Sequence, residues 1–227
     1  MVGIFDSGVG GEAALSELRM LRPSADVCFL ADRENAPYGT KSPSELVRLV
    51  SAALERLYSK GASPVLIACC TASTVFHLLP KELRVNAIPI IHRVAEAAVM
   101  ASASKRIGVI STEATYKSGA FVDSIERLCG CAHVVSCHSG ELVSLAEAGY
   151  SDENMNSECR DKIRSALSPL CTEAIDTVIL GCTHFARFDK TIEEILCVRT
   201  VNSARIGAAA LASMIPPLKG KGLTCNI

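Results

Sequence analysis

The sequence predicts an α/β protein made of two similar parallel-sheet domains, which are related by a pseudo-twofold axis and hold the active site between them. Short apolar runs alternate with helical patterns along the 227 residues. Strands that are buried on both faces of a parallel sheet have this continuous apolar character. Each half of the chain also begins with a strand that runs into a polar turn and later offers a strand that runs into a Cys/Thr cluster.

Eight apolar runs are predicted as strands, each bounded by polar or turn-forming residues. In chain order they cover residues 2–5, 27–31, 65–68, 87–91, 107–110, 134–136, 178–180 and 198–201.

The clearest helix follows the second strand. Ser42 is a capping residue, Pro43 takes the first helical position and Glu45 completes a capping box, after which the helix runs on to Gly61. Further helices are predicted over residues 11–21, 72–79, 94–104, 118–128, 141–148, 154–166, 189–196 and 204–215.

The domain boundary is inferred from the repeat, because no low-complexity linker separates the halves. The first half contains "VGIFDSGVGG" and "VLIACCT", and the second contains "IGVISTEATYKSG" and "VILGCT". We place the boundary near Arg93, after the fourth strand. The first domain then comprises residues 1–92 plus 204–227, and the second comprises residues 93–203.

Composition favours a small-molecule substrate. With 23 basic and 24 acidic residues, the net charge of -1 offers no field that would attract nucleic acid or an anionic membrane. Aromatic residues make up only 4% of the chain, which leaves few platforms for stacking bases. No apolar stretch reaches the length of a membrane span, and the N-terminus does not read as a leader peptide. We therefore expect a cytoplasmic protein that binds neither nucleic acid nor membranes.

Two of the 11 cysteines stand at strand ends, in both cases close to a threonine. Cys69 is followed by Thr71, and Cys182 by Thr183. Ligands of open parallel sheets bind beyond the carboxyl ends of the strands. If the two halves face each other, both thiols reach one cleft from opposite sides.

Two opposed thiols suit the inversion of a carbon that carries a weakly acidic hydrogen. One thiolate removes the proton from one face and the other thiol returns a proton to the opposite face. Asp6 and His184 are natural partners for controlling the protonation of the thiols, and Asp6 could also accept from a substrate ammonium group. Substrate carboxylates would be held by backbone amides of "DSGVGG" and "PYGT" and by the hydroxyls of Ser7, Thr40, Thr71 and Thr183.

Five segments together resemble the glutamate racemases of the aspartate/glutamate racemase superfamily. They are "GIFDSGVGG", "ADRENAPYGTK", "ACCTAS", "IGVISTEATYKSG" and "LGCTHF", and the match runs in order from Val2 to about Ser203. The resemblance implies racemisation of L- and D-glutamate without metal, flavin, pyridoxal phosphate or nucleotide. It also implies a supply of D-glutamate to peptidoglycan, and a homodimer.

The family pattern assigns roles to particular residues. It implies that Cys69 and Cys182 are the catalytic acid/bases, supported by Asp6, His184 and Glu147, the last in "SLAEAG". The residues that it implies for substrate binding are Asp6, Ser7, Pro37, Tyr38, Gly39, Cys70, Thr71, Thr115, Thr183 and His184.

The chain departs from the family pattern at several positions, which include Asn202 in place of aspartate and the residues that follow His184 in "GCTHFARF". Cys70 follows the first cysteine where the family usually has asparagine, and His92 stands where glycine is commoner. An asparagine amide both donates and accepts hydrogen bonds, and a thiol does so only weakly. Two alternatives stay open for this reason: a related racemase for aspartate, a hydantoin or another small carboxylate, and a binder without catalysis.

Two further alternatives belong to other classes of site. Gly8, Gly10 and Ala13 have the G-x-G-x-x-A spacing of dinucleotide-binding folds, with Asp32 at the end of the next strand. The second alternative is a tetrahedral zinc site formed by Cys69, Cys70, Cys182 and His184. The sequence spacing of these residues is not typical of zinc ligands. Eight other cysteines are interpreted as small apolar fillers: Cys28, Cys129, Cys131, Cys137, Cys159, Cys171, Cys197 and Cys225.

Overall fold

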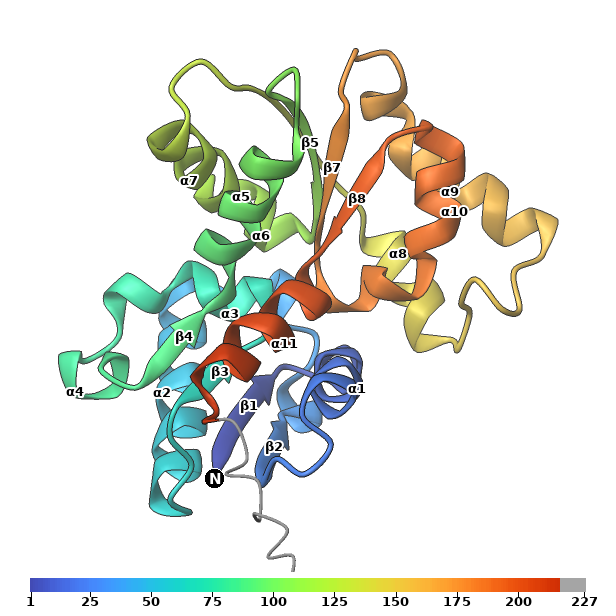
Figure 1. Cartoon of the computed structure of the whole chain (residues 1–227). Helices are drawn as coiled ribbons and strands as arrows, with labels where there is room; N and C mark the ends of the chain where they lie inside the picture. Colours follow the sequence, from blue (N-terminus) through green and yellow to red (C-terminus); the bar gives the residue numbers. More distant parts are fainter. Residues whose placement is uncertain (217–227) are drawn as a thin grey trace, which may run out of the picture.

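The computed structural model describes residues 1–216 and contains two four-stranded parallel sheets (Figure 1). The first has the strand order β2-β1-β3-β4 and the second β6-β5-β7-β8. The strands are β1 (Val2–Asp6), β2 (Val27–Ala31), β3 (Val65–Ile67), β4 (Ala87–Pro89), β5 (Arg106–Ser111), β6 (His133–His138), β7 (Thr177–Gly181) and β8 (Arg199–Asn202).

The two sheets share one topology, in which the first strand of each half lies inside the sheet. β1 pairs with β2 and β3, and β5 pairs in the same way with β6 and β7. The predicted α/β class with two similar parallel sheets is therefore confirmed. All eight predicted strands are present. The fourth ends at Pro89, two residues before its predicted end, because a helix begins at Ile90.

Helices cover the sheets and carry the connections. The α-helices are α1 (Gly11–Leu21), α2 (Pro43–Ser59), α3 (Cys70–Thr74), α4 (Lys81–Arg84), α5 (Ile90–Ala101), α6 (Glu113–Lys117), α7 (Ala120–Leu128), α8 (Gly140–Glu147), α9 (Ser157–Cys171), α10 (Asp189–Leu196) and α11 (Ser203–Met214). The 3-10 helices are η1 (Arg33–Asn35), η2 (Tyr38–Thr40), η3 (Phe76–Leu78) and η4 (Thr183–Phe188).

The predicted cap of α2 is confirmed. The Ser42 hydroxyl accepts from the Glu45 backbone N–H, the Glu45 carboxylate accepts from the Ser42 N–H, and Gly61 beyond the helix has a φ of 79°. Helix α9 differs from its prediction: it begins at Ser157, because Asn156 caps it, and it continues to Cys171 with Pro169 inside. The predicted helix over residues 72–79 is divided into α3 and η3, which are separated at Val75.

A central core joins the two sheets. It contains Ile4 and Leu66 from the first sheet and Ile107 and Ile179 from the second, together with side chains of α1, α5 and α11. Helix α11 follows the last strand of the second sheet and returns to pack beside α1 (Figure 1). Arg93 lies within α5, so the predicted boundary falls inside a helix that contributes to the shared core. Residues 217–227 of the predicted first domain lie outside the described residues.

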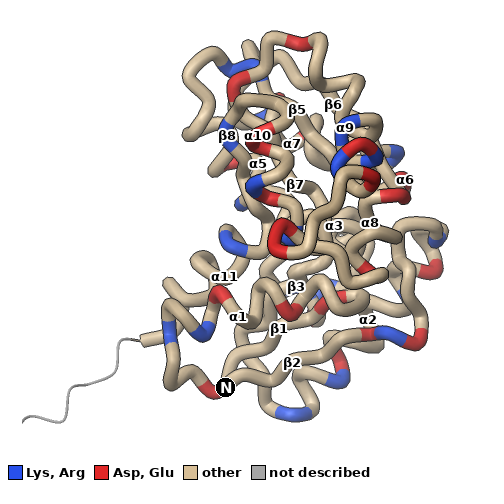
Figure 2. Tube along the Cα trace, turned by 90° about the vertical axis from the view of Figure 1, so that its right-hand side faces the viewer, with Lys and Arg blue, Asp and Glu red and all other residues tan. Residues whose placement is uncertain are grey.

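The surface carries both signs of charge. Figure 2 shows basic and acidic residues interspersed over the elements of residues 1–216. None of the helices in that range combines the length and the apolar character needed to cross a membrane.

Candidate active site

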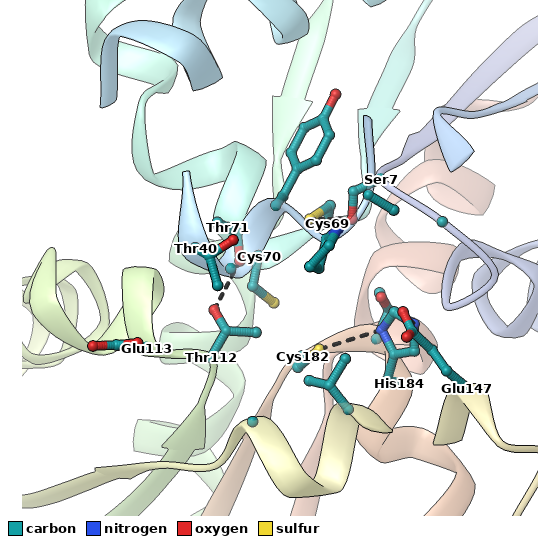
Figure 3. A pocket seen from close by; sticks show the side chains of 18 of the residues that line it. Ser7, Thr40, Cys69, Cys70, Thr71, Thr112, Glu113, Glu147, Cys182 and His184 are labelled. Carbon is teal, nitrogen blue, oxygen red and sulfur yellow. Dashed lines mark hydrogen bonds and ion pairs between the residues drawn. The ribbon is translucent and has the colours of Figure 1, made fainter. Parts of the chain in front are cut away.

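A pocket of about 390 Å³ lies between the sheets, at the carboxyl ends of their strands (Figure 3). Both halves of the chain contribute to its wall. The lining residues are Ser7, Gly8, Ala36, Pro37, Tyr38, Gly39, Thr40, Cys69, Cys70, Thr71, Thr112, Glu113, His138, Gly140, Val143, Ser144, Glu147, Cys182, Thr183 and His184.

Cys69 stands between the end of β3 and the start of α3. Its sulfur accepts from the backbone N–H of Ala72, over a distance of 3.5 Å, and lies 3.2 Å from the hydroxyl oxygen of Ser7. Burial raises the pKa of the Cys69 thiol to about 11, and the nearby Asp6 carboxylate contributes in the same direction. The thiol is therefore protonated at neutral pH in this state.

Cys182 follows β7 on the opposite side of the pocket. Its sulfur lies 3.6 Å from Nδ1 of His184. Burial raises the pKa of Cys182 well above its ordinary value, and the neighbouring thiols of Cys70 and Cys69 raise it further. Figure 3 shows Cys69 beside Ser7 and, across the pocket, Cys182 beside His184. Each thiol thus has its own polar neighbour.

His184 is neutral at ordinary pH. Burial lowers its pKa, although the carboxylate of Glu147 opposes this effect. Its buried Nε2 has no hydrogen-bond partner among residues 1–216, and it lies 3.7 Å from Oε1 of Glu147 in α8. A proton on Nε2 faces this carboxylate and leaves Nδ1 free to accept the proton of Cys182.

Asp6 lies behind the pocket wall. It is fully buried, and its carboxylate accepts from the Gly8 backbone N–H at 3.0 Å and from the Thr183 hydroxyl at 3.1 Å. Burial raises its pKa to about 7 despite these two hydrogen bonds. Asp6 does not line the pocket. It instead links the end of β1 to the segment after β7.

Three threonine hydroxyls form a second link between the halves. Thr71 of α3 lies 2.9 Å from Thr112 and 3.0 Å from Thr115, and these two are 2.9 Å apart. All three are buried. Thr71 and Thr112 line the pocket, whereas Thr115 supports them from behind and does not line it.

The segment from Pro37 to Gly39 forms one wall of the pocket. Tyr38 is buried, its ring packs near Phe5, and its hydroxyl donates to Asp32 at 2.7 Å. Its hydroxyl hydrogen is therefore engaged within the first half of the chain, while the residue itself lines the pocket.

Several lining residues were not among the predicted site residues. Glu113 and His138 lie just beyond β5 and at the end of β6, so the strand-end rule that selected Cys69 applied to them too. Four more positions lie on one face of α8 at helical spacing, and only the last was predicted: Gly140, Val143, Ser144 and Glu147.

The glycine-rich loop after β1 does not have the environment of a dinucleotide site. A Cβ atom at Gly10 would lie 2.8 Å from Cβ of Thr183, so this loop is packed against the second half of the chain. The carboxylate of Asp32 accepts from Asn35 and Tyr38. Protein groups thus engage Gly10 and Asp32, two of the residues on which the dinucleotide alternative depends.

The cysteines fall into distinct environments. Within residues 1–216, no group of three or more His, Cys, Asp or Glu side chains is arranged to hold a metal ion, so the alternative zinc set is not formed. Cys137 and Cys159 are buried as predicted for fillers. Cys131, Cys171 and Cys197 are exposed, which contradicts that interpretation, and Cys225 lies outside the described residues.

The two parallel α/β halves, each with a thiol in one shared pocket, have the arrangement expected of a racemase. A model of the Asp/Glu/Hydantoin racemase family matches residues 14–211. The chain belongs to this family.

Its relatives include glutamate racemases. It is 38% identical to the glutamate racemase of Desulforudis audaxviator over 196 residues, which are 86% of this chain and 71% of the relative. The crystal structure of glutamate racemase RacE1 from Bacillus anthracis superposes with a TM-score of 0.87 at 30% identity, over 94% of this chain and 80% of that one. Glutamate racemase from Francisella tularensis in complex with D-glutamate gives 0.85 at 26%, over 93% and 79%. The predicted resemblance and the prediction of an enzyme are confirmed.

Proposed function

We propose that the protein interconverts L- and D-glutamate by a two-cysteine acid/base mechanism without a cofactor. The observation that carries this proposal is that Cys69 and Cys182 line one pocket from opposite halves of the chain. The relatives named above are glutamate racemases, and one was crystallised with D-glutamate. The pocket of about 390 Å³ has room for an amino acid of this size.

The reaction consists of two proton transfers at Cα. In one direction the Cys69 thiolate takes the proton from one face, and the Cys182 thiol gives a proton to the other face. In the reverse direction the roles exchange. His184 prepares Cys182 as a base, because its neutral Nδ1 accepts the thiol proton across 3.6 Å. Glu147, 3.7 Å from Nε2, stabilises the resulting imidazolium.

Substrate binding brings positive charge into the pocket. Burial keeps both thiols protonated, since a thiolate in this site would be poorly solvated. The ammonium group of an amino acid brings a positive charge beside the sulfurs and favours the thiolate. Among the described residues that line the pocket, none is Lys or Arg, so carboxylates are held by backbone N–H groups and by hydroxyls such as Ser7, Thr40 and Thr71.

A second substrate class is favoured by Cys70. This buried side chain lines the pocket where the family pattern has asparagine. The weak donor ability of a thiol reduces the hydrogen bonding available to a distal carboxylate. The alternative is therefore a racemase of aspartate or another small carboxylate with the same two thiols.

A substrate panel tests both candidates. Each enantiomer of glutamate, aspartate and several neutral amino acids is incubated with the protein, and the optical signal is followed by circular dichroism. We expect the signal of either glutamate enantiomer to decay to zero, with one solvent deuterium incorporated at Cα per inversion. Inversion of aspartate alone would select the second candidate. Binding of glutamate without exchange of the Cα hydrogen of any amino acid in the panel would contradict both.

The wider setting is part of the same proposal. The product D-glutamate serves peptidoglycan synthesis in the cytoplasm, and the enzyme acts as a homodimer. Of the described residues, 1–92 and 204–216 form one domain and 93–203 the other, and the two domains close on the substrate. Closure removes water, which strengthens the electrostatic interactions at the developing carbanion.

The burial of the Asp6 carboxyl group predicts a dependence of stability on pH. Its pKa is near 7 in the folded state and near 4 when unfolded, so the folded state binds the extra proton between these values. The free energy of unfolding therefore falls as pH rises from about 4 to about 7, by up to about 4 kcal/mol. The Asp6→Asn variant should lose this slope. Urea unfolding of both proteins at pH 4 to 8 measures the difference, and parallel curves would contradict the assignment.

A further inference from the structure

A second group of neighbouring thiols lies outside the pocket. Cys129 and Cys131 flank Gly130 in the turn between α7 and β6, and their sulfur atoms are 3.4 Å apart. The backbone N–H of Ala132 donates to the Cys129 carbonyl at 2.9 Å and closes the turn. The two side chains are thus held on the same side of one tight turn.

This pair is accessible from solvent. Cys131 is exposed and Cys129 is half-buried. The turn is not crowded, because a Cβ atom at Gly130 would meet only the carbonyl oxygen of Glu126, at 4.0 Å. Core packing does not explain two neighbouring thiols of which one is exposed and the other only half-buried, since fillers of a core are buried.

We propose that the Cys129-Gly130-Cys131 turn is a dithiol site that closes reversibly into a disulfide by exchange with a small-molecule disulfide of the glutathione type. The sulfur atoms need to approach from 3.4 Å to about 2.05 Å, which rotation of the two side chains accomplishes. A disulfide between Cys129 and Cys131 closes a small, strained ring across Gly130. Strained or exposed disulfides are the ones that are easily reduced. The bond therefore reopens when reduced thiols are restored.

The exchange takes place in two steps. One thiolate of the pair attacks the small disulfide, whose S–S bond breaks to give a mixed disulfide and one leaving thiolate. The second thiol loses its proton and attacks the protein sulfur of the mixed disulfide, which releases the second small thiolate. The protein pair is oxidised by two electrons, the small disulfide is reduced to two thiols, and the two thiol protons pass to the leaving thiolates.

Charge within the pair supports this order of events. The pKa of Cys131 is raised, chiefly because its thiol is hydrogen-bonded to Cys129. A negative charge on Cys129 raises it further, because two neighbouring thiolates repel each other. The two protons therefore do not leave together, and exchange starts from a single thiolate.

The site is separate from the proposed catalytic pocket. The turn precedes β6, and the pocket is lined by His138 at the other end of this strand. Figure 1 places the turn between α7 and β6 at the end of the second sheet that is remote from the first. The proposal of a dithiol site therefore does not depend on racemase activity.

The test uses the full chain in mixtures of oxidised and reduced glutathione. Free thiols are blocked with N-ethylmaleimide, and each cysteine peptide is analysed by mass spectrometry. We expect the peptide with both cysteines to lose two hydrogens and to escape alkylation, and the closed form to exceed its glutathione adduct about tenfold or more, because the partner thiol is held in contact. The lone exposed thiols, Cys171 and Cys197, should form only adducts. Dithiothreitol should restore both alkylation sites.

Single variants provide matched controls. Cys129→Ser and Cys131→Ser should each convert the closed form into a stable glutathione adduct on the remaining cysteine, whereas Cys197→Ser should leave closure unchanged. Far-ultraviolet circular dichroism checks that the variants are folded. Independent adducts on Cys129 and Cys131 in the wild type, or a disulfide from either to another cysteine, would overturn the proposal.

Discussion

Replacing either Cys69 or Cys182 with serine is expected to reduce kcat for racemisation by about a thousandfold or more. A serine hydroxyl is a far weaker acid than a thiol, and loss of a positioned acid or base costs about 10²–10⁴-fold in rate. Both cysteines take part in every inversion, so either substitution should stop the reaction in both directions. Circular dichroism of L- and D-glutamate with each purified variant measures this effect.

Solvent-deuterium exchange distinguishes the roles of the two thiols. Each single variant keeps one base on one side of the pocket, so it should exchange the Cα hydrogen of only one enantiomer, and the two variants should select opposite enantiomers. Cys197→Ser changes an exposed thiol outside the pocket and should have wild-type activity. Full activity in both active-site variants would refute the two-cysteine mechanism.

The sheets were predictable because burial on both faces leaves a local signal. Each strand reads as an apolar run without help from distant residues, and all eight were found. Helix α6 was missed because its five residues, Glu113–Lys117, are too few to show helical periodicity. The hydroxyl cap of Thr112 was the available signal for its start.

The candidate site was predictable at the level of strand ends, but not at the level of contacts. Cys69 and Cys182 follow buried strands, so the rule for open parallel sheets selected them. The same rule selected Asp6, whose side chain is buried behind the wall and not in the pocket. Whether a side chain at a strand end points into the pocket depends on how the two halves pack. For Asp6 the decisive partner is Thr183, which is 177 positions away in the sequence.

The glycine-rich loop shows the same limitation. Its G-x-G-x-x-A spacing is typical of a pyrophosphate site, but spacing alone does not tell whether a phosphate or a protein group occupies the loop. Here Gly10 permits the close approach of Thr183, and Gly11 permits α1 to pack against Asp6 and Phe29. These glycines therefore allow close packing at the junction between the two halves, where the loop after β1 meets the segment after β7. This junction brings the two cysteines together.

This junction makes Gly10→Ala the second substitution with a large expected effect. The new Cβ atom would lie 2.8 Å from Cβ of Thr183, closer still to its hydroxyl oxygen, and 3.1 Å from the backbone nitrogen of His184. The overlap includes main chain and a side chain that is bonded to Asp6, so rotation of one flexible group does not relieve it. We expect a loss of about 1–3 kcal/mol in the free energy of unfolding, as for other overpacked sites.

The rate should fall further than the stability. The segment that must move carries Thr183 and His184 directly after Cys182, and a displacement of about 1 Å at a catalytic group costs about a hundredfold in rate. Urea unfolding and the racemisation assay measure the two effects on the same preparation. Gly8→Ala is the stability control, because its Cβ atom would meet nothing within 4 Å. If Gly10→Ala kept both the wild-type unfolding free energy and the wild-type kcat, the packing of this loop would not position Cys182, and the thiol would be held by β7 alone.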